Sequence, residues 1–117
     1  FQRKTETKLQ GRINRRSMVD FPIAIPAAAD FRRAENMVES CCRRLGLVLG
    51  MKTTLVKHPG SIHWHFKRPA QSGTLEITVW PSKRRAWMTV QDGRKAEWIR
   101  DVLPILGDQL EKAFERG

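Results

Sequence analysis

The sequence has few cysteines and no long apolar run, and both shortages narrow the class of protein. Its two cysteines, Cys41 and Cys42, are adjacent, a spacing at which an ordinary disulfide cannot easily form. No window approaches the roughly 18 apolar residues of a membrane span, and the first residues are basic and polar, unlike a secretory signal. These features predict a cytoplasmic protein with reduced thiols and no membrane partner.

The motifs of common enzyme classes are also missing. The chain has no Gly-x-Ser-x-Gly turn, no phosphate-binding loop and no Rossmann glycine pattern. Apolar and polar residues alternate in segments 62–66, 75–79 and 86–90, and Glu76 is the only acidic residue within them. A paired-carboxylate site is therefore not expected. No catalytic residue and no cofactor are predicted, and an enzyme is disfavoured.

Acidic residues are outnumbered by basic ones. Lysine and arginine total 22 against 12 aspartates and glutamates, which gives a net charge of +10. Half of this excess falls in residues 1–17, which show no periodicity and are expected to be a basic, disordered leader. The other half belongs to residues 18–117, which we expect to form a single α+β domain. A basic domain of this kind favours a polyanionic partner.

Three segments alternate apolar and polar residues, the pattern of half-buried strands: 62–66, 75–79 and 86–90. The connections between them contain proline, glycine or serine and are too short for a crossover helix. The three strands should therefore form an antiparallel meander.

Two less regular segments precede this meander. A fourth strand is expected at 47–57, bent at Gly50, with Met51 facing the core and Lys52 facing solvent. Its poor alternation is typical of an edge strand. Residues 21–26 contain two prolines and are expected to lie extended along the domain or at a sheet edge.

A helix is expected on each side of the strands in the sequence. Between Asp30, a candidate N-cap, and Gly46, a candidate C-cap, apolar residues recur every three or four positions. A second stripe of this kind runs from Ala96 to Phe114, and Pro104 is expected to kink or restart that helix. The predicted fold class is α+β: a two-layer α-β-β-β-β-α order, with a four-stranded antiparallel meander and two helices packed on one face.

The opposite face of the predicted sheet carries tryptophans and donors where solvent is expected. Basic residues gather at its two ends. The residues expected to contact a ligand are His63, His65, Lys67, Arg68, Trp80, Lys83, Arg84, Arg85, Trp87, Arg94 and Lys95. Cations that hold phosphates around flat groups that stack bases suit a sequence-tolerant single-strand binder. We therefore predict a small basic module that binds single-stranded DNA or RNA.

Two alternative functions stay open. A protein partner can cover Trp80 and Trp87, which would make the chain an assembly subunit or a homodimer through the sheet face or the helices. Alternatively, His63 and His65 point the same way on one strand and could share a metal with a third ligand. His58, Glu76 or a cysteine could supply that ligand, giving a metal-dependent enzyme. No second ligand cluster supports this hypothesis, and we expect no bound metal.

The predicted order of four strands and a helix, over residues 51–115, resembles an architecture of known single-strand binders. Whirly, purine-rich-element-binding and transcriptional-coactivator proteins share it, and several of them work as dimers. The resemblance is one of element order, and no motif is matched residue by residue. It implies single-strand binding, although the helix before the sheet departs from those families and could occupy their dimerising surface.

Overall fold

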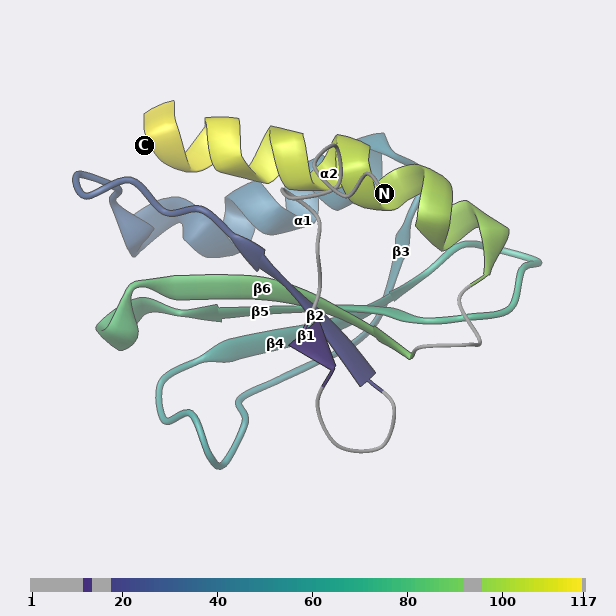
Figure 1. Cartoon of the computed structure of the whole chain (residues 1–117), viewed down its shortest axis with the longest axis horizontal. Helices are drawn as coiled ribbons and strands as arrows, with labels where there is room; N and C mark the ends of the chain where they lie inside the picture. Colours follow the sequence, from purple (N-terminus) through teal and green to yellow (C-terminus); the bar gives the residue numbers. More distant parts are fainter. Residues whose placement is uncertain (1–11, 14–17, 92–95, 117) are drawn as a thin grey trace, which may run out of the picture.

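The chain folds as two layers, an antiparallel sheet and two helices that cover one face of it (Figure 1). The structure is a computed structural model that describes residues 12–13, 18–91 and 96–116. Within these residues the strands are β1 (Arg12–Ile13), β2 (Met18–Ile23), β3 (Val48–Thr53), β4 (Ile62–Lys67), β5 (Leu75–Trp80) and β6 (Arg85–Gln91). The helices are α1 (Ala34–Arg44) and α2 (Glu97–Arg116), and two 3₁₀ turns cover Phe31–Arg33 and Pro81–Lys83.

The described sheet has six strands rather than the four expected, in the order β1-β2-β6-β5-β4-β3, and every neighbouring pair is antiparallel. Strands β3 to β6 form the predicted meander, and β2 adds beside β6. β2 tolerates Pro22, which has no N–H, because β1 pairs with β2 only at Val19 and Asp20. Arg12–Ile13 of the expected leader form β1, and the rest of residues 1–17 lie outside the described residues.

The core lies between the sheet and the helices. From the sheet it buries Val19, Phe21, Trp64, Phe66, Leu75, Ile77, Val79, Met88 and Val90, and from the helices Val38, Trp98, Ile99, Leu106, Leu110 and Phe114. Full burial of one large apolar side chain contributes about 1.5–3 kcal/mol, so this interface between the layers is the main stabilising contact.

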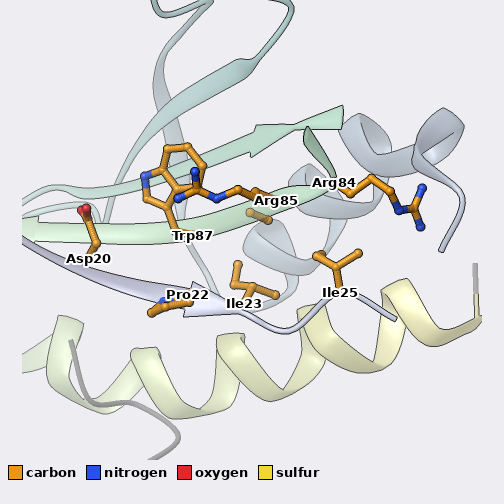
Figure 2. Close-up of a pocket in the computed structure, with 8 residues that line it drawn as sticks. Asp20, Pro22, Ile23, Ile25, Arg84, Arg85 and Trp87 are labelled. Atoms are coloured by element: carbon orange, nitrogen blue, oxygen red, sulfur yellow. The ribbon is translucent and has the colours of Figure 1, made fainter. Parts of the chain in front are cut away.

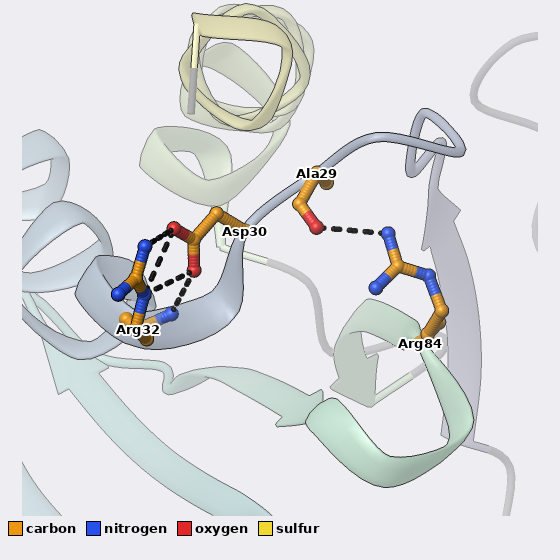
Figure 3. A network of polar contacts seen from close by, with 4 residues as sticks. All are labelled: Ala29, Asp30, Arg32 and Arg84. Atoms are coloured by element: carbon orange, nitrogen blue, oxygen red, sulfur yellow. Dashed lines mark hydrogen bonds and ion pairs between the residues drawn. The ribbon is translucent and has the colours of Figure 1, made fainter.

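Asp30 and Gly46 flank the first helical segment as predicted, although α1 itself has Arg33 as its N-cap and Leu45 as its C-cap. The Asp30 carboxylate accepts a hydrogen bond from the Arg32 backbone N–H (2.9 Å) and pairs with the Arg32 guanidinium (Figure 3). The side-chain bonds from Arg32 lower the pKa of Asp30 to about 2. Asp30 caps a 3₁₀ turn, and α1 follows it from Ala34. At the other end Gly46 has φ +79°, the conformation for which a glycine C-cap is suited.

The second helix runs without interruption from Glu97 to Arg116, so it does not restart at Pro104. Pro104 is exposed on the helix, where the N–H that it lacks leaves no core group unpaired. Neither α1 nor α2 is both long and apolar enough to cross a membrane.

The predicted orientation of β3 is wrong, because the strand contains a bulge. Its register with β4 shifts between Leu49 and Met51, so Gly50 is an additional residue opposite β4. One extra residue moves every later side chain to the other face. Lys52 therefore lies on the helix side, and Met51 lies on the open face.

Lys52 is held on that side by two glutamates of α1. Its Nζ pairs with Glu35 and lies 2.7 Å from Oε2 of Glu39. The same Glu39 oxygen accepts the indole N–H of the fully buried Trp64 (2.9 Å).

Candidate functional site

The sheet face away from the helices is built from two rows of directly paired side chains. The first row is Asp20, Thr89, Glu76, His65 and Met51, and the second is Pro22, Trp87, Thr78, His63 and Thr53. His63, His65 and Trp87 thus lie on the face on which the alternation predicted them. The pairing also places a carboxylate and hydroxyls beside the imidazoles.

Trp80 and Trp87 are half-buried rather than open, because part of the β3–β4 connection folds against them. The His58 ring meets Trp80 edge-on, with ring centroids 4.3 Å apart, and its centroid is 5.3 Å from that of Trp87. The Trp80 indole N–H donates to the backbone carbonyl of Pro59 (2.9 Å). In Figure 1 this connection lies on the side of the sheet away from the helices.

Two cations lie close to these rings, and a third, Lys57, precedes His58 in the chain. The Lys83 Nζ lies 6.0 Å from the Trp80 ring centroid, and the Arg85 guanidinium lies 5.0 Å over Trp87. Burial lowers the pKa of His58, and the charges of Arg85 and Lys57 lower it further. Within the described part of the chain, no carboxylate forms an ion pair with Lys57, Lys83 or Arg85. We call Lys57, His58, Trp80, Lys83, Arg85 and Trp87 the cationic aromatic patch.

A hollow of about 250 Å³ continues this patch toward β2. Figure 2 shows the side chains of Arg85 and Trp87 close together on its rim, with Ile23 of β2 and Ile25 of the segment after β2 opposite them. The hollow therefore combines apolar side chains and an indole ring with Arg84, Arg85 and Asp20.

Arg84, which was predicted to contact a ligand, instead fastens two segments of the protein together. Its guanidinium donates to the backbone carbonyls of Pro26 (3.3 Å), Ala27 (2.9 Å) and Ala29 (2.9 Å), and the last of these bonds is drawn in Figure 3. It also lies 5.2 Å over the Phe31 ring. All three bonds are donated by one guanidinium nitrogen, Nη2, and together they fix the position of the side chain.

Among the described residues, the cations expected at the other end of the sheet do not form a cluster. Arg68 donates to the carbonyl of Leu45 at the end of α1 (3.0 Å) and lies 5.5 Å over the Trp98 ring. Lys67 is exposed at the end of β4. Arg94 and Lys95 lie outside the described residues.

A second polar cluster occupies the middle of the open face. The Nε2 atom of His63 lies 3.2 Å from Nε2 of His65 and 3.3 Å from Oε1 of Glu76, and Nε2 of His65 lies 3.8 Å from Oε2 of Glu76. The other ring nitrogen of His63, Nδ1, lies 2.8 Å from the hydroxyl of Thr78. His63 is 6% exposed and Thr78 is fully buried. These residues have the atom types and spacing of a metal-binding cluster.

Among the three options for a third ligand, the register selects Glu76, which lies directly opposite His65. His58 packs on the tryptophans instead. Cys41 and Cys42 are buried on α1, in the other layer. Burial raises the pKa of the Cys42 thiol to about 12, so it stays protonated at neutral pH. Sequence alternation alone placed Glu76 on the right face but could not give its distance from the imidazoles.

Comparisons with other proteins add no functional assignment to this geometry. The predicted resemblance to single-strand binders rests on element order alone. No protein-family model, no curated protein sequence and no solved structure gives a significant match to the chain.

Proposed function

We propose that the chain binds single-stranded nucleic acid at the cationic aromatic patch, by ring stacking and phosphate contacts with little sequence readout. The observation that carries this proposal is the set of cations, Lys57, Lys83 and Arg85, beside Trp80 and Trp87 without carboxylate partners among the described residues. Cations that hold the backbone and aromatic rings that stack the bases are the two components that sequence-tolerant single-strand binders combine.

The rings and cations have complementary roles in this proposal. A base can stack on the Trp87 indole or on the planar guanidinium of Arg85, and base–aromatic stacking contributes about 1–3 kcal/mol per base. The phosphates on either side of that base then meet Lys57, Lys83 and Arg85, which release counterions when they bind. The hollow beside Trp87 gives an unstacked base an apolar surface on the β2 side.

The patch favours single strands over duplexes. Stacking on Trp80 or Trp87 requires a free base face, and a duplex keeps its base faces inside the stack. Helix α1 carries Glu35 and Glu39 on the side that meets Lys52, so it lacks a uniformly basic face for a DNA groove.

Fluorescence anisotropy with a labelled oligonucleotide at several salt concentrations tests the proposal. The double variant Lys83→Gln/Arg85→Gln should lower the slope of log affinity against log salt by about 1.4, because each lost phosphate contact removes about 0.7. A matched double variant on α2, Arg100→Gln/Arg116→Gln, removes the same charge from exposed positions. It should leave the slope nearly unchanged.

A variant that lacks the Trp87 ring measures the contribution of stacking separately from that of the phosphate contacts. Trp87→Ala should weaken binding by about 1–3 kcal/mol at an unchanged salt slope, because an indole releases no counterions. Two results would contradict the proposal: no binding to the wild-type chain at low salt, or an equal loss of slope in both charge variants.

A second candidate function, protein assembly, is favoured by a different surface. Val48, Leu49 and Met51 on edge strand β3 are 51%, 44% and 42% exposed. An apolar hollow of about 300 Å³, lined in part by Leu47 and Phe66, lies beside them. An added strand from another chain would cover this edge.

Sedimentation of the purified chain tests the assembly function. If β3 pairs with a second copy, Met51→Lys should shift the distribution toward monomer. A monomeric wild-type chain at micromolar concentration would exclude self-assembly. If Trp87→Ala shifted the distribution instead, the sheet face would be the interface.

A further inference from the structure

We propose that His63, His65 and Glu76 bind a zinc-type divalent metal ion on the open face of the sheet. The candidate ligand atoms come from two paired strands, β4 and β5, and lie within 4.8 Å of one another. This site is independent of the nucleic-acid proposal, because none of its three ligands belongs to the cationic aromatic patch.

The separations between the ligand atoms suit a tetrahedral ion. Bonds of about 2.0–2.1 Å at the tetrahedral angle place two ligand atoms about 3.3–3.4 Å apart. Nε2 of His63 lies 3.2 Å from Nε2 of His65 and 3.3 Å from Oε1 of Glu76, whereas the separation of 3.8 Å between His65 and Glu76 is to the other carboxylate oxygen, Oε2. The longest of these joins the two more exposed side chains, which can adjust by small rotations.

The electronic character of the three residues is compatible with a cation between them. A neutral imidazole presents a lone pair at whichever ring nitrogen lacks the proton, and an ionised carboxylate only accepts. In the tautomer in which Nδ1 of His63 carries the proton, the Nε2 lone pair of His63 faces Glu76 directly. One metal ion would then satisfy His63, His65 and Glu76 together.

Thr78 supplies the outer contact that metal-binding histidines require. Its hydroxyl lies 2.8 Å from Nδ1 of His63, so it can accept the Nδ1 proton and leave Nε2 free for the metal. Such partners fix the ring orientation and the tautomer of a ligand histidine. This role accounts for a fully buried threonine on the face of the sheet that lacks helices.

The ligand set identifies the class of metal. Two imidazole nitrogens and one carboxylate oxygen suit Zn²⁺ and its neighbours, whereas Ca²⁺ and Mg²⁺ prefer oxygen ligands throughout. In the described part of the chain no fourth ligand, whether a histidine, a cysteine or a carboxylate, joins the cluster. His65 and Glu76 are only half-buried, so water can complete the coordination. Three protein ligands and a water are the arrangement of catalytic rather than structural zinc sites.

This proposal revises the sequence-based expectation of no metal. That expectation rested on the lack of a second ligand cluster, with Glu76 as one of three options for the place of the third ligand. Glu76 fills that place because antiparallel pairing sets it directly opposite His65, and a carboxylate isolated in the sequence is then close to both histidines.

Titration of the metal-free, tag-free chain with Zn²⁺, followed by calorimetry, tests the site, and Co²⁺ serves as a spectroscopic substitute. We expect one equivalent per chain and the visible absorption of tetrahedral Co²⁺. His65→Ala and Glu76→Gln should each weaken binding by roughly 100-fold or more, because loss of an outer partner alone costs about 10- to 100-fold. Thr78→Val removes the outer partner and should weaken Zn²⁺ binding by about 10- to 100-fold. His58→Ala removes the third histidine of the chain, which lies outside the cluster, and should retain the affinity.

Circular dichroism of each variant shows whether it is folded. His65 and Glu76 are partly exposed, so their variants remain informative if Thr78→Val does not fold. The proposal is wrong if the wild-type chain binds no Zn²⁺ at 100 times its own concentration, because the cluster is then held by a shared proton alone. It is equally wrong if the folded His65→Ala and Glu76→Gln variants keep wild-type affinity, or if His58→Ala loses as much affinity as they do.

Discussion

Glu35 and Glu39 both contact Lys52, and their replacement by alanine is expected to have very different effects. The Glu35 side chain is about half exposed and only pairs with the lysine. The Glu39 side chain is 22% exposed and also accepts the indole N–H of Trp64, which is completely buried. Only Glu39→Ala leaves a buried donor without an acceptor.

The two magnitudes follow from this difference. An exposed ion pair contributes about 0.2–1 kcal/mol, so Glu35→Ala should cost less than about 1 kcal/mol. A buried donor left unsatisfied costs about 1–3 kcal/mol, so Glu39→Ala should cost about 2 kcal/mol. For a domain of this size that corresponds to a fall in melting temperature of roughly 6–10 °C.

Urea unfolding, followed by tryptophan fluorescence, gives both free energies, and a double-mutant cycle isolates the indole bond. In a Trp64→Phe background no donor remains, so Glu39→Ala should cost about 1 kcal/mol less than in the wild type. Equal costs for Glu35→Ala and Glu39→Ala, or an unchanged cost of Glu39→Ala in the Trp64→Phe background, would refute the reasoning.

The pH dependence gives an independent measurement of the same contacts. Lys52 and then Trp64 hold the pKa of Glu39 below its usual value of 4.5, against the opposing effect of burial. The unfolded chain therefore binds the Glu39 proton more readily than the folded chain does. Stabilisation by Glu39 is present above about pH 4.5 and is lost as pH falls further, so the wild type and Glu39→Ala should converge in stability at acidic pH.

Three further predictions concern other contacts. Arg84→Ala should cost about 1–2 kcal/mol in urea unfolding, through its lost carbonyl bonds, yet leave the salt slope of oligonucleotide binding unchanged; a reduced slope would show that Arg84 contacts phosphate. Because burial lowers the pKa of His58 in the folded state, the unfolded state binds its proton first. Stability should fall as pH drops through about 6.5, and by less in His58→Phe, in melting curves from pH 8 to 5.5. Gly73→Ala should lower the melting temperature more than Gly46→Ala, because both have positive φ but only a Cβ at position 73 would be pressed against neighbours, 3.1 Å from Cβ of Ala96 and 3.2 Å from Cδ1 of Ile99 in α2; equal effects would contradict this packing.

The central strands of the fold were predictable because their alternation is strict and one face is dry. Segments 62–66, 75–79 and 86–90 lie within β4, β5 and β6. A bend of β3 was expected at Gly50, but the residue pattern did not show that Gly50 adds a residue opposite β4 and so reverses the faces of the residues after it. Pro22 limited the prediction for β2 to an extended or edge segment, and the proline is tolerated because β1 is so short.

The candidate site was likewise predictable only in part. Alternation placed Trp80, Trp87 and both histidines on the open face, since that property depends only on the two-residue period. It could not show that His58 folds back onto the tryptophans or that Arg84 turns toward the β2 side. Those contacts depend on loop conformation, which hydrophobic period does not specify.

The position of β2 in the sheet has a consequence for the order in which the molecule assembles. β2 comes near the start of the chain, yet its ladder partner is β6, with Met18 opposite Gln91 and Ile23 opposite Ala86. During synthesis β2 can pair only with the two residues of β1 until β6 has been made, whereas β3 to β6 form successive hairpins between sequence neighbours. Pulse-labelling hydrogen exchange should therefore show protection of β4 and β5 before Val19 and Phe21, and simultaneous protection would argue against this order. Until β6 arrives, the apolar residues of β2 remain exposed, so nascent chains truncated before β6 are the species in which this protein is most prone to aggregate.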